Sequence, residues 1–216
     1  MAIFRKGVHP RAHKERTSGV PIAPGPEPGE VWLPLTQHIG APALPVVQAG
    51  ERVLRGQLVA RKADGISANV YSPVAGTVKE IAGHITSSGK KQDHIHIVND
   101  HTDESVGLPP LSERTPESVL SRIEEAGIVG MGGAGFPTAV KLNVSGRVDV
   151  LVVNGAECEP YITCDERIML EYADELFAGI RLCMLASGAK EAVIGIEKNK
   201  PEAIALLRQK AGEGVF

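Results

Sequence analysis

The chain has 216 residues, of which 43% are hydrophobic, and its formal net charge at pH 7 is −3. This length lies between one large domain and two small ones, and we expect two domains. A weakly acidic chain with 4% aromatic residues has neither the basic surface nor the stacking side chains typical of nucleic-acid binding. No apolar run approaches the roughly 20 residues that span a bilayer, so we also predict no transmembrane segment.

The first 110 residues predict an extended segment followed by a β-rich module. Residues 18–30 contain four prolines, so we interpret residues 1–30 as an extended N-terminal lead-in. From about Val31 to Val98, short apolar runs are separated by glycine-containing turns. This pattern is typical of a small β sandwich or barrel, which we place at residues 31–110.

The phrase SPVAGTV (residues 72–78) resembles the turn that follows the attachment lysine in biotinyl and lipoyl carrier domains. Counted back from Pro73, the position of that lysine is taken by Gly65, and Lys62 is displaced by three residues. On a tight hairpin this displacement changes both the face and the reach of the side chain. We therefore expect a carrier-like fold that serves for docking and has no carrier chemistry.

Beyond residue 110, helices and strands are predicted to alternate. A helix is expected to begin at Pro116, with Thr115 as its cap and Gly127 as its stop. The apolar runs 149–154 and 191–196 predict two strands, the first of them covered on both faces.

Two more helices complete this predicted region. One is expected from about Glu166 to Ala186 behind Asp165 as cap, and the other over residues 201–210. The apolar stripe of the longer helix comprises Ile168, Tyr172, Leu176, Ile180 and Cys183. Strand, helix, strand, helix is the order of a parallel α/β sheet, here the first part of an incomplete α/β domain at residues 111–216. Two strands make a very small sheet, so we expect the chain to be the front part of a longer protein.

Residues 130–138, GMGGAGFPT, contain Gly130, Gly132, Gly133 and Gly135. Backbone without Cβ can approach a ligand closely and turn successive N–H groups toward an anion. The alternative is a tight helix-to-strand turn with no ligand. Lys141 lies three residues after Thr138 and can place a cation over a bound phosphate, which favours a binding loop.

A second polar motif, NGAECEP (residues 154–160), begins where the first predicted strand ends. Ligands of open α/β sheets collect at the carboxyl ends of strands, so Asn154, Glu157 and Glu159 are candidate site residues. Two carboxylates two residues apart repel each other unless hydrogen bonds or a ligand compensate. The alternative is that they are solvated acids in a loop.

The segment GMGGAGFPTAVK resembles the flavin loop of the NADH-oxidising subunit of respiratory complex I, and VNGAECEP resembles that subunit's next motif. GVHPRAHKERT, PLTQHIGAPALPVVQAGERVLRGQ and IGIEKNKPEAI are similar to the C subunit of the Rnf (Rsx) ion-translocating electron-transport complex. Two positions depart from the complex I pattern: Met131 stands where arginine is usual, and Ala156 where aspartate is usual. Each departure removes a charged contact of the kind often worth about 1.5–3 kcal/mol.

The resemblance implies a bound FMN that takes hydride from NADH and passes single electrons to iron-sulfur clusters. It implies that the loop glycines approach the flavin and that Lys141 holds its phosphate. Asn154 and Glu157 would bond the ribityl chain or ring, while Phe136 and Glu159 would face the nicotinamide nucleotide. It implies no catalytic side chain and no metal ligand within this chain.

The resemblance also bears on partners. The family carries C-x-x-C-x-x-C-x-x-x-C-P runs for two 4Fe-4S clusters, whereas this chain has only Cys158, Cys164 and Cys183. We therefore expect the clusters in a missing C-terminal part, and little electron transfer by this chain alone. The implied partners are the other subunits of the complex, with the chain peripheral on the cytoplasmic side of the inner membrane. Two alternatives stay open: a cobalamin-reductase-type flavoprotein and a non-catalytic docking fragment.

Weaker candidates are interpreted as structural. His94 and His96 share one face of a predicted strand, but no third ligand lies nearby in the sequence. Cys158 and Cys164 flank the acidic motif without C-x-x-C spacing, which favours ordinary packing. An odd number of cysteines argues against a disulfide framework and agrees with a reducing compartment.

Overall fold

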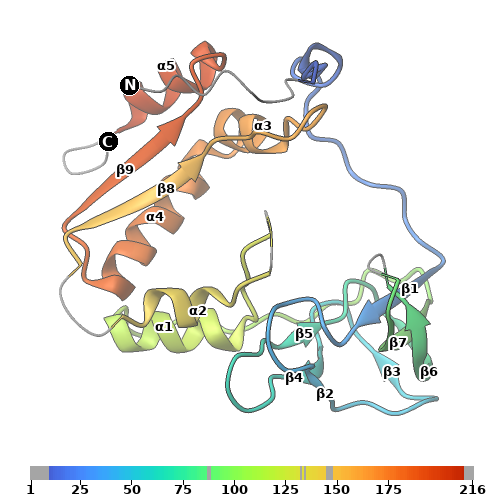
Figure 1. Cartoon of the computed structure of the whole chain (residues 1–216). Coiled ribbons are helices and arrows are strands. Elements are labelled where there is room, and N and C mark those ends of the chain that lie inside the picture. The colour runs from blue at the N-terminus through green and yellow to red at the C-terminus, as the bar shows by residue number, and fades with distance from the viewer. Residues whose placement is uncertain (1–9, 87–88, 132, 134, 145–147, 212–216) are drawn as a thin grey trace. The chain divides into compact units, whose positions relative to one another are not determined.

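The computed structural model describes residues 10–86, 89–131, 133, 135–144 and 148–211. Backbone contacts divide the chain into two compact units (Figure 1). The β unit comprises Pro26–Gly146, and the α/β unit comprises Met1–Gly25 together with Arg147–Phe216. The domain boundaries expected from the sequence, 31–110 and 111–216, stay predictions.

The β unit contains two antiparallel sheets. The first has the strand order β1-β7-β6-β3, from β1 (Glu30–Pro34), β7 (Lys91–Asn99), β6 (Gly76–Ile85) and β3 (Arg52–Val53). The second has the order β2-β4-β5, from β2 (Leu44–Pro45), β4 (Leu58–Arg61) and β5 (Val70–Tyr71).

One apolar core joins these strands. In the longest pairing, Val78 of β6 lies opposite Ile97 of β7, and both side chains are fully buried. The alternation of side chains along each strand turns one face inward, where burial of apolar surface stabilises the fold. The buried members are Leu35, Ala43, Val47, Val53, Val59, Ala60, Val70, Val74, Val78, Ile95 and Ile97. The predicted small β sandwich or barrel is confirmed.

The β unit also holds two helices on either side of the glycine-rich segment. Helix α1 (Pro116–Glu125) begins at the predicted residue, and Thr115 and Ser118 cap it by exchanging side-chain to backbone hydrogen bonds. The chain leaves α1 through Gly127, whose φ is +64°. Helix α2 (Thr138–Leu142) follows the glycine-rich segment.

The α/β unit is built on a two-stranded parallel sheet, which confirms the prediction of a parallel α/β arrangement. Strand β8 (Val150–Gly155) pairs with β9 (Glu191–Ile196), with Val152 opposite Val193. The prediction that the first strand is covered on both faces is wrong, because Val152 is 71% exposed. The buried core of this unit gathers on the other face, which carries Leu151 and Val153.

The long helix predicted from Glu166 to Ala186 is in fact two helices. Helix α3 (Cys164–Glu171) and helix α4 (Ala173–Ser187) are separated at Tyr172, whose backbone is not helical (φ −125°, ψ 36°). Asp165 lies inside α3, and Thr163 is the N-cap residue.

The predicted apolar stripe is wrong at its first two residues. Ile168 and Tyr172 are more than 40% exposed. The residues that follow them, Met169 and Ala173, are buried instead, whereas Ile180 is buried as predicted. The prediction assumed one uninterrupted helix, whereas the break at Tyr172 ends one helix and starts another. The residues that pack against the sheet from these helices are Met169, Ala173, Phe177 and Ile180.

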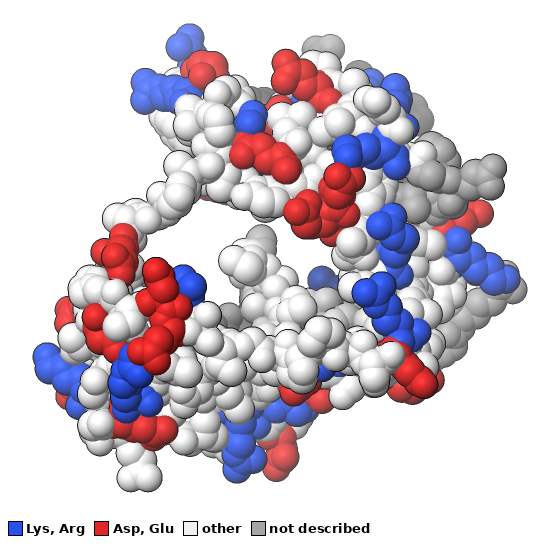
Figure 2. Space-filling view, turned by 180° about the vertical axis from the view of Figure 1, so that it is seen from behind, with Lys and Arg blue, Asp and Glu red and all other residues white. Residues whose placement is uncertain are grey.

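Helix α5 (Pro201–Lys210) occupies the residues predicted for it and contributes Ala203 and Leu207 to the same core. Within the part of the chain that the structure describes, no helix is long and apolar enough to cross a bilayer. Figure 2 shows acidic and basic side chains interspersed on the visible face of each unit.

Candidate functional site

The glycine loop (residues 130–136) is closed at its neck by the backbone. The Gly130 N–H donates to the Phe136 carbonyl at 2.9 Å, and the Thr138 N–H donates to the Ile128 carbonyl at 2.9 Å. Val129 and Pro137 form an antiparallel bridge between these bonds. The neck therefore fixes where the loop leaves α1 and enters α2.

The described glycines of this loop serve different purposes. A Cβ on Gly133 would meet no atom within 4 Å, so its backbone is open to a ligand. Gly135 has φ +64°, and a Cβ there would lie 2.6 Å from the carbonyl oxygen of Gln37. Glycine at position 135 is thus required by packing inside the β unit. Gly132 lies outside the described residues.

Lys141 of α2 lies beside the start of the glycine loop. Its Nζ is 4.0 Å from the position that a Cβ on Gly130 would take, and its side chain is exposed. Phe136, at the other side of the neck, is half-buried. The structure therefore places the Lys141 ammonium beside the start of the glycine loop, and the anion-binding role predicted for the loop stays a prediction.

The acidic loop (residues 154–162) begins with the last two residues of β8 and continues beyond that strand in the α/β unit. The side chain of Asn154 is exposed, and its Oδ1 accepts the Ala156 N–H at 3.1 Å. Glu159 is exposed, whereas Glu157 is only 3% exposed. The two carboxylates therefore do not share a side, and the repulsion expected from their spacing is avoided.

Glu157 is the acceptor of a buried ion pair. Its Oε2 lies 2.6 Å from Nζ of Lys200, and its Oε1 accepts the Asp165 N–H at 2.7 Å. Nζ of Lys200 also lies 3.4 Å from a carboxylate oxygen of Glu166. The Lys200 ammonium and the Asp165 N–H thus satisfy a carboxylate that would otherwise be costly to bury.

The pKa values of this pair shift in opposite directions. Burial raises the pKa of Glu157, but the Lys200 ammonium and the Asp165 N–H outweigh burial, and the pKa lies below its ordinary value. Burial lowers the pKa of Lys200, but the Glu157 and Glu166 carboxylates outweigh it and raise the pKa above its ordinary value. Both groups are therefore charged at neutral pH.

Lys200 and Lys14 are site residues that the sequence interpretation missed. Lys200 follows the carboxyl end of β9, next to β8, so the rule that placed Asn154 at the sheet edge also indicated the segment of Lys200. Lys14 donates to the carbonyl oxygens of Glu157 and Ile162 from a part of the chain predicted to be an extended lead-in. No local pattern indicated that contact.

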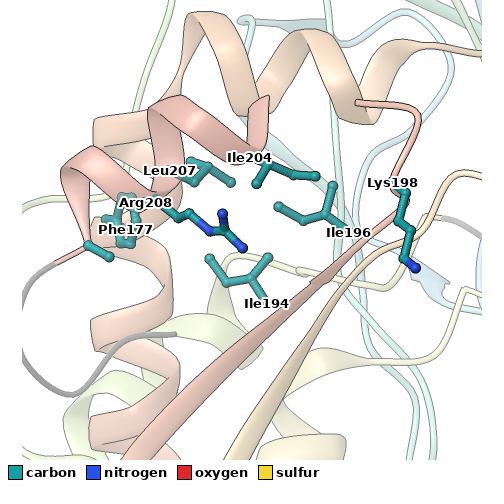
Figure 3. A pocket seen from close by; sticks show the side chains of 8 residues that line it. Phe177, Ile194, Ile196, Lys198, Ile204, Leu207 and Arg208 are labelled. Carbon is teal, nitrogen blue, oxygen red and sulfur yellow. The ribbon is translucent and has the colours of Figure 1, made fainter. Parts of the chain in front are cut away.

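Several cavities lie in the α/β unit, among them a small one of about 100 Å³ whose lining includes Asn154, and two larger ones. One of about 590 Å³ adjoins the ion pair, and its lining includes Lys14, Glu166 and Lys200. The other, of about 410 Å³, is mainly apolar; Figure 3 shows Ile194 and Ile196 of β9 facing Ile204, Leu207 and Arg208 of α5 across it. Its lining also contains Lys198 but none of the predicted site residues, so it does not belong to the predicted anion-binding site.

The histidines and cysteines singled out in the sequence have other partners. His96 is buried, stacks on Trp32 at 3.8 Å between ring centroids, and lies 2.8 Å from a carboxylate oxygen of Glu30 through Nε2. His94 lies 2.7 Å from the Gln92 carbonyl through Nδ1. Atoms of Glu157, Cys164 and Asp165 lie within 4.8 Å of one another, but Lys200 already neutralises the buried carboxylate, and we assign no metal ion there.

Two known domain families match this chain. Residues 2–102 match the RnfC barrel sandwich hybrid domain, and residues 123–214 match the Nuo51 FMN-binding domain. The second match contains both the glycine loop and the acidic loop. The chain thus combines a barrel sandwich hybrid domain with an FMN-binding domain.

Relatives that match nearly the whole chain identify the protein family more closely than the two domains do. The chain is 45% identical to the C subunit of the proton-translocating ferredoxin:NAD(+) oxidoreductase complex of Clostridium ljungdahlii, over 98% of this chain and 47% of that protein. It is 45% identical to the C subunit of the ion-translocating oxidoreductase complex of Rhodobacter capsulatus, over 93% of this chain and 40% of that protein. The chain belongs to the family of Rnf complex C subunits and spans less than half the length of these relatives.

Among solved structures, an NAD+-reducing [NiFe]-hydrogenase in the air-oxidised state matches 44% of this chain at 31% identity. The match covers 17% of the hydrogenase chain, with a TM-score of 0.41.

Proposed function

We propose that this chain binds FMN through residues of the glycine loop and of the acidic loop, and that it forms part of an NADH-oxidising subunit of an Rnf-type membrane complex. One observation carries the proposal: Nζ of Lys141 lies beside Gly130, at the start of the glycine loop, within a segment that matches an FMN-binding domain. The phosphate of FMN carries about two negative charges at neutral pH and requires N–H donors and a cation, which this arrangement offers.

Different residues would contact different parts of the cofactor. Gly132 and Gly133 would present backbone N–H groups to the phosphate end, with Lys141 as its counter-ion, while the Gly130 N–H closes the neck of the loop. Asn154 and Glu159, whose side chains are exposed, would bond the ribityl chain, the ring or the nicotinamide nucleotide.

Phe136 and Glu157 act at the edges of this site. Phe136 would help to exclude water from the face of the flavin where hydride arrives. The carboxylate of Glu157 is held by Lys200, so Glu157 would contribute through the position of its loop. Bound FMN would supply the chemistry of accepting hydride from NADH and releasing single electrons.

The remaining parts of the proposed activity lie outside these 216 residues. Electrons would pass to 4Fe-4S clusters in the further length of the relatives, and partner subunits would carry out ion translocation. The chain would be peripheral, on the cytoplasmic side of the inner membrane. The C-subunit relatives, whose names place them in oxidoreductase complexes, support this assignment over a cobalamin reductase or a docking fragment.

A flavin titration tests the proposal. FMN and riboflavin are each added to the purified chain, and the change in visible absorption and fluorescence gives their dissociation constants. We expect FMN to bind, and Lys141→Gln to weaken FMN by roughly tenfold or more, because a hydrogen bond to a charged group contributes about 1.5–3 kcal/mol. Riboflavin lacks the phosphate, so its affinity should not change.

Lys79→Gln is the matched control. Lys79 is an exposed lysine of β6 in the same unit, outside the glycine loop, so this variant should bind FMN like the unmodified chain. A chain that binds no FMN, or a Lys141 variant that keeps full FMN affinity, would overturn the proposal.

A further inference from the structure

An N-terminal strap (residues 10–22) lies on the acidic loop and on α3. It belongs to the same compact unit as these elements, although more than 130 residues separate them in the sequence. The strap is tied to α3 at two points: Arg167 Nη1 donates to the Ser18 carbonyl at 3.2 Å, and the Ile22 N–H donates to the Glu171 carboxylate at 3.1 Å. These bonds place the middle of the strap against the loop that carries Glu157.

Tyr161, in the acidic loop, is held by the strap on both sides of its backbone. Its N–H donates to the Ala12 carbonyl at 2.7 Å, and its carbonyl accepts the Thr17 hydroxyl at 2.7 Å. The rings of Tyr161 and His13 are stacked, with centroids 5.0 Å apart. Tyr161 has φ +65°, which is unfavourable for a bulky residue and persists only where surrounding contacts hold it.

Lys14 is the centre of these contacts. Its ammonium donates to the carbonyl of Glu157 and, at 2.9 Å, to the carbonyl of Ile162, so it joins the two ends of the turn. The same ammonium lies 3.8 Å from the Glu157 carboxylate, and its side chain is 14% exposed. Three N–H donors on one ammonium suit this task, because each can meet a different oxygen.

Lys14 and Lys200 have different tasks at Glu157. Lys200 neutralises the buried carboxylate at 2.6 Å and would leave an uncompensated charge if it were removed. Lys14 mainly bonds the backbone, so its loss frees the loop while the carboxylate keeps Lys200 as partner.

We infer that Lys14 is a positioning residue that holds the acidic loop in the conformation needed for flavin binding. The inference rests on the proposed FMN site, because the loop carries Asn154 and Glu159. Among the described residues, no hydrogen bond or ion pair joins Lys14 to either of these two side chains. Lys14 would therefore act on the ring and ribityl end of the flavin, and not on the phosphate end.

Flavin binding to Lys14→Met and Lys14→Arg tests the inference. We expect Lys14→Met to weaken FMN and riboflavin by the same factor, about tenfold, which corresponds to the loss of one charge-assisted hydrogen bond. This equal loss contrasts with Lys141→Gln, which should weaken FMN alone. Lys14→Arg should recover most of the affinity, since a guanidinium can also bond two carbonyl oxygens. Lys210→Met, which removes a lysine paired with Asp174 on the surface of the same unit, is the control.

Hydrogen exchange gives a second readout that needs no flavin. In the unliganded chain, Lys14→Met should speed amide exchange in residues 157–165, and Lys210→Met should not. Unchanged exchange in Lys14→Met, or a lowered melting temperature with unchanged flavin affinity, would overturn the inference and leave the proposed function intact. An unmodified chain that binds no flavin would overturn the proposed function and the flavin role of Lys14, even if exchange changed.

Discussion

The glycine loop and the acidic loop are held in different ways. Two backbone hydrogen bonds close the glycine loop at its neck, and Gly133 beyond it has no atom within 4 Å of its Cβ position. The acidic loop is bonded by lysines from two distant segments, and its central carboxylate is buried in an ion pair. One loop thus offers open backbone, and the other offers side chains on a fixed frame. The first arrangement suits an anionic group, and the second suits hydrogen bonds to polar groups of a ligand.

The substitution with the largest expected effect on stability removes the cation that is paired with Glu157 of the acidic loop. Lys200→Met leaves Glu157 buried without its cation, which should lower the free energy of unfolding by about 3–5 kcal/mol. Urea unfolding followed by circular dichroism measures the loss. Lys210→Met breaks an exposed ion pair and should cost less than about 1 kcal/mol.

A double variant shows whether Lys200→Met loses stability because the Glu157 charge is left unpaired or because side-chain packing is lost. Adding Glu157→Leu to Lys200→Met removes both charges and should recover most of the stability. A double variant less stable than Lys200→Met would show that the ion pair is not the main contribution of these residues.

The next prediction concerns the glycine loop. It compares Gly135, which packing requires, with Gly133, which has open space around its Cβ position. Gly135→Ala places a Cβ 2.6 Å from the Gln37 carbonyl at a φ of +64°, and it should lower the free energy of unfolding by more than about 1 kcal/mol. Gly133→Ala meets no neighbour, so it should leave stability nearly unchanged while weakening FMN. Thermal unfolding and flavin titration of both variants check this difference. Equal losses of stability would contradict it.

The smallest effect is the pH dependence of the acidic loop. Although burial raises the pKa of Glu157, Lys200 and the Asp165 N–H bring it below its ordinary value. The contribution of the carboxylate to stability is therefore complete above the ordinary pKa of about 4.3 and is lost as the pH falls through the folded-state pKa. Between about pH 6 and pH 3, the unmodified chain should lose more free energy of unfolding than Glu157→Gln. Parallel curves for the two proteins in urea at each pH would contradict this prediction.

Local signals predicted much of the fold. Thr115 and Pro116 marked the start of α1, and Pro201 marked the start of α5, because caps and helix-initiating prolines depend on neighbours a few residues away. The break at Tyr172 was missed, since its sequence continues a helical period and no glycine or proline interrupts it. The exposed face of β8 was missed because a continuous apolar run does not tell how many faces are covered.

The site was predictable where a motif is local. The glycine loop and Lys141 lie within 12 residues of each other, and the structure brings Lys141 beside Gly130. The burial of Glu157 depends on Lys200, 43 residues away, and its loop depends on Lys14, 143 residues away. Such contacts depend on how the elements are arranged in three dimensions. Periodicity in a single sequence does not predict them. The cofactor contacts expected for the residues of both loops and for Lys141 stay predictions.

The assembly of the α/β unit from two separate stretches has a consequence for synthesis on the ribosome. The β unit is continuous in sequence, so it can fold as soon as residue 146 has emerged. The strap is translated early, but its hydrogen-bond partner Tyr161 follows Ala12 by about 150 residues, a delay on the order of 10 s at typical translation rates. A bulky fusion at the N-terminus should therefore interfere with the half that carries the acidic loop, and spare the module whose strands follow it directly.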